Sequence, residues 1–358
     1  MPGPSPFAWL GQVTQTTAGR EEFSVTSHAR LSWIALSCRQ IAGEASARFE
    51  PGRRWPSAGP ALHLVLLLLH DDAGDAMSRL LDYLIAPMLM AGALLATWAL
   101  LARQLPGLLV VGLVVGGVAL SAAVLERLRP ERPDYRALDR PLAVEAAHFL
   151  INYQLGYALS LGALAAVQAG MRRWQLPVLW PSKWPLLAQL ALTGVLAEML
   201  AYVQHRLMHR VPWLWRFHAL HHSGERLNVV RTGRFHGVDI GLAVFLTLLP
   251  LLLLGAPESL TTWVSIVGAV LGVLQHANIR MRTFWWLDRI FCTPTVHRHH
   301  HSSDMAESNA NFGTLLMLFD WLCGTYVRPQ GPGPKAMGIV DDPVPRDFWR
   351  AFLQPLGL

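Results

Sequence analysis

Charge is scarce in this chain of 358 residues. Only 15% of the residues are Asp, Glu, Lys or Arg, whereas a soluble domain averages about 25%. Hydrophobic residues make up 52% of the chain, and the mean hydropathy is +0.31. This combination argues against both a soluble globular protein and a disordered one. The long apolar runs predict a single membrane-embedded unit instead.

Cysteine is also scarce, and the three present, Cys38, Cys292 and Cys323, form no C-x-x-C pair. A disulfide framework is therefore excluded. The sequence has no C-x-x-C-H motif and no G-x-G-x-x-G placed after a strand, so no haem, flavin or iron–sulfur motif is found. The net charge of +6 comes mostly from Arg beside apolar runs. This placement suits membrane flanks, and we expect no nucleic-acid partner.

Three regions differ in composition. Residues 1–76 are rich in Ser, Gly, Pro and Arg, show no sustained period and carry no signal-peptide pattern. We expect a poorly structured leader that contributes nothing to function, with Met77 as an alternative start. Residues 77–330 form the membrane domain, and residues 331–358 form a C-terminal tail.

Apolar runs predict an all-α, polytopic membrane helical bundle. A spanning helix needs about 20 mostly apolar residues. Two of the runs are joined by Gly255-Ala256-Pro257-Glu258, which predicts a tight helical hairpin. The six predicted spans are residues 83–102, 107–125, 142–169, 186–204, 239–255 and 258–275.

The orientation follows from one basic loop. By the positive-inside tendency, the loop between the second and third spans is cytoplasmic. Counting spans from there, the fourth span ends on the cytoplasmic face at His205, and the hairpin returns to that face at His276. All the histidine clusters described below are therefore expected in a helical cap on the cytoplasmic side. The basic residues of the loop are Arg127, Arg129, Arg132, Arg136 and Arg140.

Histidine is abundant, and eleven of the fifteen histidines fall between His205 and His301. His299 lies about 200° round a helix from His297, so we leave it out of the ligand set. Two single histidines, His236 and His276, stand between the clusters. Three clusters have i, i+3 or i+4 spacing, which places each cluster on one helix face: His205 and His209; His218, His221 and His222; and His297, His300 and His301.

Imidazole is a good ligand for iron, zinc, copper and nickel. Eight to ten histidines exceed the needs of one four-coordinate zinc ion. They suit two metal ions that each keep a position open, and a carboxylate-poor shell indicates a dinuclear iron site for oxygen chemistry.

Two other classes are consistent with parts of the pattern. A histidine-rich membrane metal transporter or sensor would prefer polar groups within its spans, and these spans contain only Glu145, His148 and Glu198 as exceptions. An intramembrane zinc protease needs H-E-x-x-H, but Arg206 follows His205.

The combined pattern resembles the fatty acid hydroxylase/sterol desaturase superfamily of membrane di-iron oxygenases. The resemblance rests on the three clusters, on R-F-H at His236 and on H-x-N at His276. It also rests on T-P-x-x-H-x-x-H-H from Thr293 to His301, on Asn309-Ala-Asn311-Phe-Gly313, and on Asp320-Trp-Leu-Cys-Gly324-Thr325. The H-x-N form is similar to the bacterial branch near alkylglycerol monooxygenase. The chain departs from the family at Gly237 and Asp239, where Pro and Glu are frequent, and at Phe312, where Tyr is usual.

This resemblance implies O₂-dependent hydroxylation, or desaturation, of a C–H bond in a lipid such as a sterol, a fatty acyl chain or an ether lipid. It implies two iron ions (Fe²⁺/Fe³⁺), O₂ as co-substrate and an external electron donor, which would be a separate reductase or small redox protein. Ten metal ligands are implied: His205, His209, His218, His221, His222, His236, His276, His297, His300 and His301.

Metal-ligating imidazoles usually donate their second ring N–H to a polar neighbour. Five side chains near the clusters are candidates for this role: Asp239, Asn278, Asp304, Glu307 and Asn311.

Overall fold

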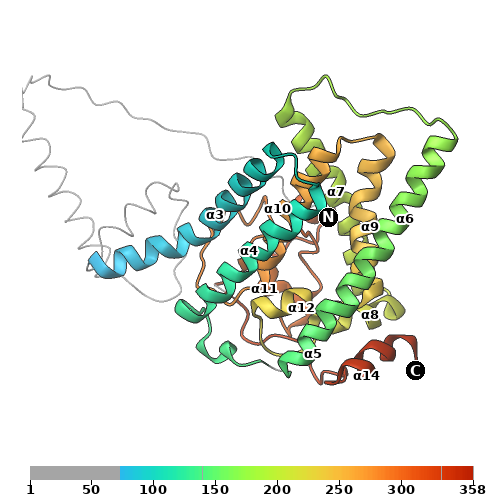
Figure 1. Ribbon diagram of the computed structural model, residues 1–358. Coiled ribbons are helices and arrows are strands. Elements are labelled where there is room, and N and C mark those ends of the chain that lie inside the picture. Colours follow the sequence, from blue (N-terminus) through green and yellow to red (C-terminus); the bar gives the residue numbers. More distant parts are fainter. Residues whose placement is uncertain (1–72, 139, 332, 358) are drawn as a thin grey trace, which may run out of the picture. The chain divides into compact units, whose positions relative to one another are not determined.

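The computed structural model describes residues 73–138, 140–331 and 333–357, and all that follows concerns this part of the chain (Figure 1). Every regular element in these ranges is a helix, and no β-strand occurs among them. The prediction of an all-α fold is therefore confirmed. The predicted leader, residues 1–76, lies almost entirely outside the described residues.

Within the described ranges, six helical runs are long and apolar enough to cross a membrane. Five of them contain a whole predicted span, and the run Gly237–Leu254 ends one residue before the predicted span 239–255 does. The third run is interrupted, because α5 (Leu142–Ala147) continues into a π-helix, η2 (His148–Tyr153), and then into α6 (Gln154–Arg173). The other five are α3 (Ala73–Ala102), α4 (Gly107–Leu128), α7 (Leu186–Arg210), α9 (Gly237–Leu254) and α10 (Glu258–His276).

Proline and glycine set several helix boundaries. Pro106, Pro185 and Pro257 directly precede α4, α7 and α10. The fixed φ of proline suits the start of a helix, and its missing N–H costs little there. Gly255 ends α9 with φ 74°, a left-handed conformation that favours glycine. The predicted hairpin between α9 and α10 is thus present.

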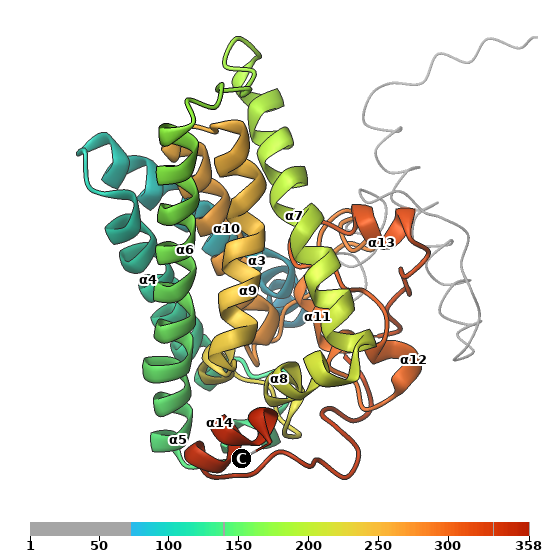
Figure 2. The ribbon, with the colours of Figure 1, turned by 90° about the vertical axis from the view of Figure 1, so that its right-hand side faces the viewer.

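The long helices pack in two sets (Figures 1 and 2). In the first set, α3, α4 and α10 share an apolar core that includes Val110, Val114 and Ile266. In the second set, α9 packs against both α6 and α7, and α7 also contacts α10. Large apolar side chains such as Leu95 and Leu120 stay exposed on the outside, as expected for a lipid-facing surface.

The contact between α6 and α9 is unusually close. A Cβ at Gly156 would collide with the backbone oxygen of Gly237, and would lie 3.0 Å from the nitrogen of Gly241. The hydroxyl of Ser160 donates to the carbonyl oxygens of Gly156 (2.9 Å) and Gly241 (2.5 Å). Only glycine permits this approach, and the contact fixes the start of α9.

Most of the short helices lie at the end of the bundle where α7 and α10 end, and α13 lies further along α7 (Figure 2). The helix α14 lies within the region predicted as a C-terminal tail, and its Ala351 packs with Val344 against Ala219 and Leu220 of α8. The short elements are η1 (Pro133–Arg136), α8 (Pro212–His222), η3 (Val229–Gly233), α11 (Pro294–His300), α12 (Met305–Ser308), α13 (Leu318–Leu322), α14 (Phe348–Leu353) and η4 (Gln354–Leu356).

Candidate metal centre

Nine of the ten histidines singled out in the sequence form two groups. Within each group the available ring nitrogens lie within 4.8 Å of one another. We call the first group the five-histidine group and the second the four-histidine group. The first contains His205, His209, His218, His222 and His300; the second contains His221, His276, His297 and His301.

Four helices supply these rings. The C-terminal part of α7 gives His205 and His209 to the five-histidine group, and the end of α10 gives His276 to the four-histidine group. The helix α8 contributes rings to both groups, and so does α11 together with His301, which directly follows it. The three histidines of an H-x-x-H-H segment therefore do not all belong to one group. Each of the two segments contributes rings to both groups.

Hydrogen bonds to backbone carbonyls fix which nitrogen of His205 and His300 carries the proton. Nδ1 of His205 donates to the oxygen of Phe312, and Nδ1 of His300 donates to the oxygen of Ala310, both at 2.8 Å. A carbonyl oxygen only accepts, so in the neutral rings both Nε2 atoms present lone pairs. These Nε2 atoms face each other at 3.0 Å. Two lone pairs cannot form a hydrogen bond, whereas a cation bound by both nitrogens removes their repulsion.

The four-histidine group is built in the same way. Nδ1 of His276 donates to the oxygen of Gly272 at 2.7 Å. Its Nε2 atom lies 3.3 Å from that of His221 and 3.2 Å from that of His297. The Nε2 atoms of His297 and His301 are 3.0 Å apart. Two imidazole nitrogens bound about 2.1 Å from one metal ion at right angles would be about 3 Å apart.

A carboxylate orients one ring of the five-histidine group. Nδ1 of His218 donates to Oδ2 of Asp239 at 2.8 Å, and both side chains are buried. The other carboxylate oxygen, Oδ1, accepts from the side-chain amide of Gln204 at 3.1 Å. A carboxylate behind an imidazole fixes its tautomer and raises its basicity as a ligand. Asp239 therefore reaches its histidine although the family often has Glu here.

The nine rings lie in an environment that largely excludes water. Eight are buried, and only His209 is half-buried. Burial lowers the pKa of His300 to about 3 and holds the pKa of His297 and His301 well below the usual value. Among the described residues, the buried Nε2 atoms of His209, His218 and His222 have no hydrogen-bond partner. Each such orphan costs about 1–3 kcal/mol, and metal coordination would satisfy it. The residues present therefore fit a pair of metal ions.

His236, the tenth predicted ligand, is not brought into either group. Its Nδ1 accepts from the backbone N–H of Val238 at 3.1 Å, and its Nε2 donates to the oxygen of Phe352 at 3.1 Å. The ring also stacks on Phe352, with centroids 5.3 Å apart. Both nitrogens are thus used, and the contacts made by His236 tie α14 to the start of α9.

His299, which was left out of the predicted ligand set, also lies outside both groups. Its Nδ1 is 2.9 Å from the oxygen of Thr295, and its Nε2 is 3.2 Å from the oxygen of Gln330.

Of the five side chains proposed to support the ligands, Asp239 forms a hydrogen bond with His218 of the five-histidine group. Asn278 bonds the backbone of Arg132, and Asn311 bonds the backbone of Val327. Asp304 caps α12 by accepting from the N–H of Ala306. The side chains of Asn278, Asn311 and Asp304 therefore stabilise loops and a helix end around the site. Glu307 lies within α12, whose N-terminus Asp304 caps.

Two buried acids that were not assigned a role hold the loop that orients His205. Asp320 accepts from the N–H groups of Phe312 (2.9 Å) and Gly313 (2.7 Å). Glu198 accepts from the N–H groups of Thr314 and Leu315. The carbonyl oxygens of Phe312 and Ala310 in this segment accept from His205 and His300. In the sequence, Glu198 could have been singled out because it is an acidic residue within an otherwise apolar helix.

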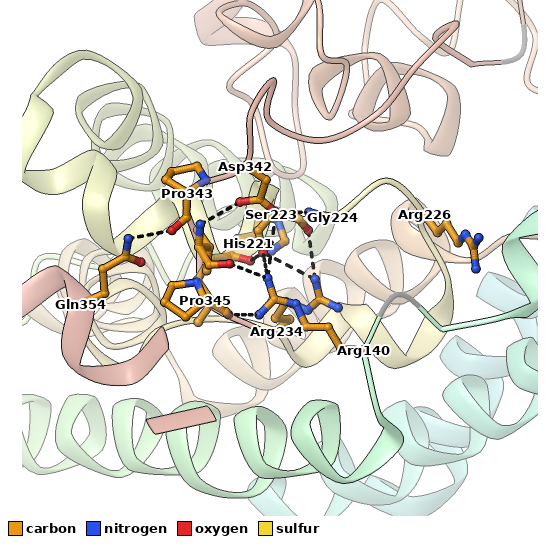
Figure 3. Close-up of polar contacts among 12 residues, drawn as sticks. Arg140, His221, Ser223, Gly224, Arg226, Arg234, Asp342, Pro343, Pro345 and Gln354 are labelled. Carbon is orange, nitrogen blue, oxygen red and sulfur yellow. Dashed lines mark hydrogen bonds and ion pairs between the residues drawn. The ribbon is translucent and has the colours of Figure 1, made fainter. Parts of the chain in front are cut away.

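Arginines hold the chain directly after α8 (Figure 3). Arg234 donates to the oxygen of Ser223 at 2.9 Å and forms a buried ion pair with Glu145. Arg140 donates to the hydroxyl of Ser223 at 3.2 Å and to the oxygen of Pro345. These contacts connect α8, which carries three of the nine rings, to α5 and to the C-terminal segment.

Comparison with known proteins agrees with this arrangement. The family model for fatty acid hydroxylase matches residues 190–325, a range that contains all nine rings. The chain is 39% identical over 242 residues to an ornithine lipid hydroxylase of Rhizobium tropici, covering 65% of this chain and 71% of that protein.

More distant relatives are matched over shorter parts of their length. An alkylglycerol monooxygenase of Caenorhabditis elegans is 24% identical over 52% of this chain and 35% of its own length. A cholesterol 25-hydroxylase of Homo sapiens is 26% identical over 42% of this chain and 56% of its own length. No solved structure matches the chain.

Proposed function

The chain belongs to the fatty acid hydroxylase family of integral membrane oxidoreductases, and from this premise we propose that it binds two iron ions and uses O₂ to hydroxylate a C–H bond of a membrane lipid. The observation that supports a pair of ions is the division of nine imidazoles into two adjacent groups.

We assign one ion to the five-histidine group and the other to the four-histidine group. An all-nitrogen set disfavours magnesium and calcium, which prefer oxygen ligands. A five-histidine group exceeds the four ligands usual for structural zinc. Iron bound here would supply the activation of O₂ that C–H oxidation needs. His236 is omitted from this assignment, because both of its nitrogens are used elsewhere.

The chain's own residues prepare the site in three ways. Three backbone carbonyls and one carboxylate each accept a hydrogen bond from the Nδ1–H of a ring, which directs Nε2 of that ring towards the metal position. The acceptors are the carbonyls of Phe312, Ala310 and Gly272 and the carboxylate of Asp239. Burial of the rings limits the access of water. The long apolar helices provide a surface on which a lipid chain can approach.

A membrane lipid with a polar headgroup is the substrate class we propose. The relatives named above are called hydroxylases or monooxygenases, and the one at 39% identity is named for ornithine lipid. Hydroxylation is therefore favoured over desaturation, and ornithine lipid is the first substrate to test.

We place the two groups on the cytoplasmic side and propose that electrons come from a separate reductase or small redox protein. The Arg-rich loop after α4 meets the residues that follow His276: the N–H of Arg132 donates to Oδ1 of Asn278 at 2.9 Å, and the N–H of Glu131 donates to its backbone oxygen at 3.1 Å. The loop and the histidines thus share one end of the bundle, which the positive-inside tendency assigns to the cytoplasm.

The test is lipid mass spectrometry of a bacterial host that makes ornithine lipid and expresses either the wild-type chain or His300→Ala. We expect a lipid species that gains one oxygen atom with the wild-type chain and is absent with the variant. A lipid species that loses two hydrogen atoms would indicate desaturation instead of hydroxylation. An unchanged lipid profile with well-folded, iron-loaded protein would contradict the proposal.

A further inference from the structure

A small cavity lined in part by Arg298 of α11 lies outside the two histidine groups. It measures about 80 Å³, and its walls include Glu131, Arg132, Asn278, Arg298 and Gly333. Glu131 and Arg132 follow the end of α4 at Leu128, and Asn278 follows the end of α10 at His276. Both helices are candidate spans. The cavity therefore sits where the chain leaves the apolar layer, the level of lipid headgroups.

Arg298 gives this cavity its chemistry. The side chain is only 3% exposed. Its Nη2 atom donates to the carbonyl oxygens of Ala277 (2.9 Å) and Ile279 (2.8 Å), whereas its buried Nη1 atom has no hydrogen-bond partner in the described part of the chain. A guanidinium stays protonated and offers several N–H donors. An unpaired donor on a buried cation is costly, so a partner with oxygen acceptors is expected.

The acids nearby are already paired. Oε2 of Glu131 accepts from Nη1 of Arg282 at 2.8 Å. Oε1 of the buried Glu126 accepts from the N–H groups of Val229 (2.6 Å) and Asn278 (2.7 Å). Arg132 lines the same cavity, but its guanidinium pairs with the exposed Asp134 at 3.3 Å and lies over the ring of Tyr135. Arg298 therefore keeps an unpaired N–H donor group at the cavity, and guanidinium groups bind phosphate and carboxylate oxygens strongly.

We propose that this cavity binds an oxyanion, the phosphate or carboxylate of a lipid headgroup, on Nη1 of Arg298. The site builds on the proposed lipid-oxidising function but does not depend on turnover. Arg298 stands between His297 and His299 on α11, and its Nη2 holds the backbone that follows His276. A bound headgroup would therefore stabilise the backbone next to His276 and His297, two rings of the four-histidine group.

Gly333 allows a test that leaves Arg298 unchanged. A Cβ at Gly333 would meet only Cδ of Arg298, at 4.0 Å, so Gly333→Leu fills the cavity without a backbone collision. Ala336→Leu is the matched control, because it adds comparable bulk at an exposed position of the same segment. Thermal unfolding of both variants checks that they fold like the wild type.

The experiment is native mass spectrometry of the full chain in detergent with dioleoyl phosphatidylglycerol, dioleoylglycerol or inorganic phosphate as the probe. We expect the wild type and Ala336→Leu to retain phosphatidylglycerol, and Gly333→Leu to bind it about tenfold or more weakly. Dioleoylglycerol should bind all three equally. Competition by inorganic phosphate would support the oxyanion site and assign it to a free anion, whereas no competition assigns it to the lipid.

Equal retention of phosphatidylglycerol by Gly333→Leu and Ala336→Leu would overturn the proposal, as would equal binding of phosphatidylglycerol and dioleoylglycerol by the wild type. Because binding is measured without turnover, loss of hydroxylation with intact lipid binding would count against the proposed function alone.

Discussion

His218 donates its Nδ1 proton to Oδ2 of Asp239 at 2.8 Å, and this pair joins the H-x-x-H-H helix α8 to the first turn of α9. The carboxylate lies behind the ring, so Nε2 of His218 points into the five-histidine group. Both elements are also held by other contacts. The helix α9 packs closely on α6 through glycines, and Arg234 and Arg140 bind Ser223 directly after α8.

Asp239→Asn tests this link. The amide keeps the size of the side chain but loses the charge that raises the basicity of the ring, and we expect metal affinity or activity to fall about 10- to 100-fold. Iron content after dialysis against a weak chelator measures the effect. Asp304→Asn is the control, because Asp304 caps α12 and Asn caps helices equally well. A similar loss of iron in both variants would rule out the specific role of Asp239.

Single substitutions should separate the histidines of the two groups from His299. His300→Ala removes a ring of the five-histidine group, and His221→Ala removes one of the four-histidine group. We expect either change to abolish product formation and to lower iron content. His299→Ala should be much milder, because the ring contacts the carbonyls of Thr295 and Gln330 outside both groups. Comparable iron loss in all three variants would contradict the ligand assignment.

His236→Ala should behave as a structural variant. The ring donates to the oxygen of Phe352 and stacks on its side chain, so its loss should destabilise the docking of α14 by about 1–3 kcal/mol. We expect a lower Tm with nearly wild-type iron content, measured on the same preparation. A variant that keeps its Tm but loses iron would return His236 to the ligand set.

The close contact of α6 and α9 predicts that Gly156→Ala destabilises the protein by about 1–3 kcal/mol, because the new methyl group meets the backbone of Gly237. Gly162→Ala, in the same helix, has no neighbour within 4 Å. It should be neutral or slightly stabilising, since alanine favours a helix over glycine. Thermal unfolding in detergent compares the two, and equal Tm values would refute the packing argument.

Much of the architecture could be predicted from local sequence. Length and hydropathy alone predict the six apolar helices, because a span needs a long run of apolar residues. The spacing of His218, His221 and His222 predicts a shared face, because helix geometry is fixed. Local spacing does not predict which rings belong to the five-histidine group and which to the four-histidine group. That division depends on where α7, α10 and α11 approach α8.

Other features depend on contacts between distant residues. The carbonyls of Phe312 and Ala310 orient two ligands, but any residue has a carbonyl, so the sequence carries no signal for them. His236 was predicted as a ligand from its R-F-H segment, whereas its partner Phe352 is 116 residues away. The π-helical turn inside the third span was missed because it changes the register without changing the hydropathy.

The metal content of the purified wild-type chain tests the central claim most directly. Elemental analysis of protein loaded with Fe²⁺ under anaerobic conditions and then desalted should give two iron ions per chain, and addition of O₂ with a reductant and lipid should consume O₂. His300→Ala with His221→Ala should retain no iron. Protein that folds normally but retains zinc alone, or no metal at all, would contradict the assignment of the two histidine groups to iron.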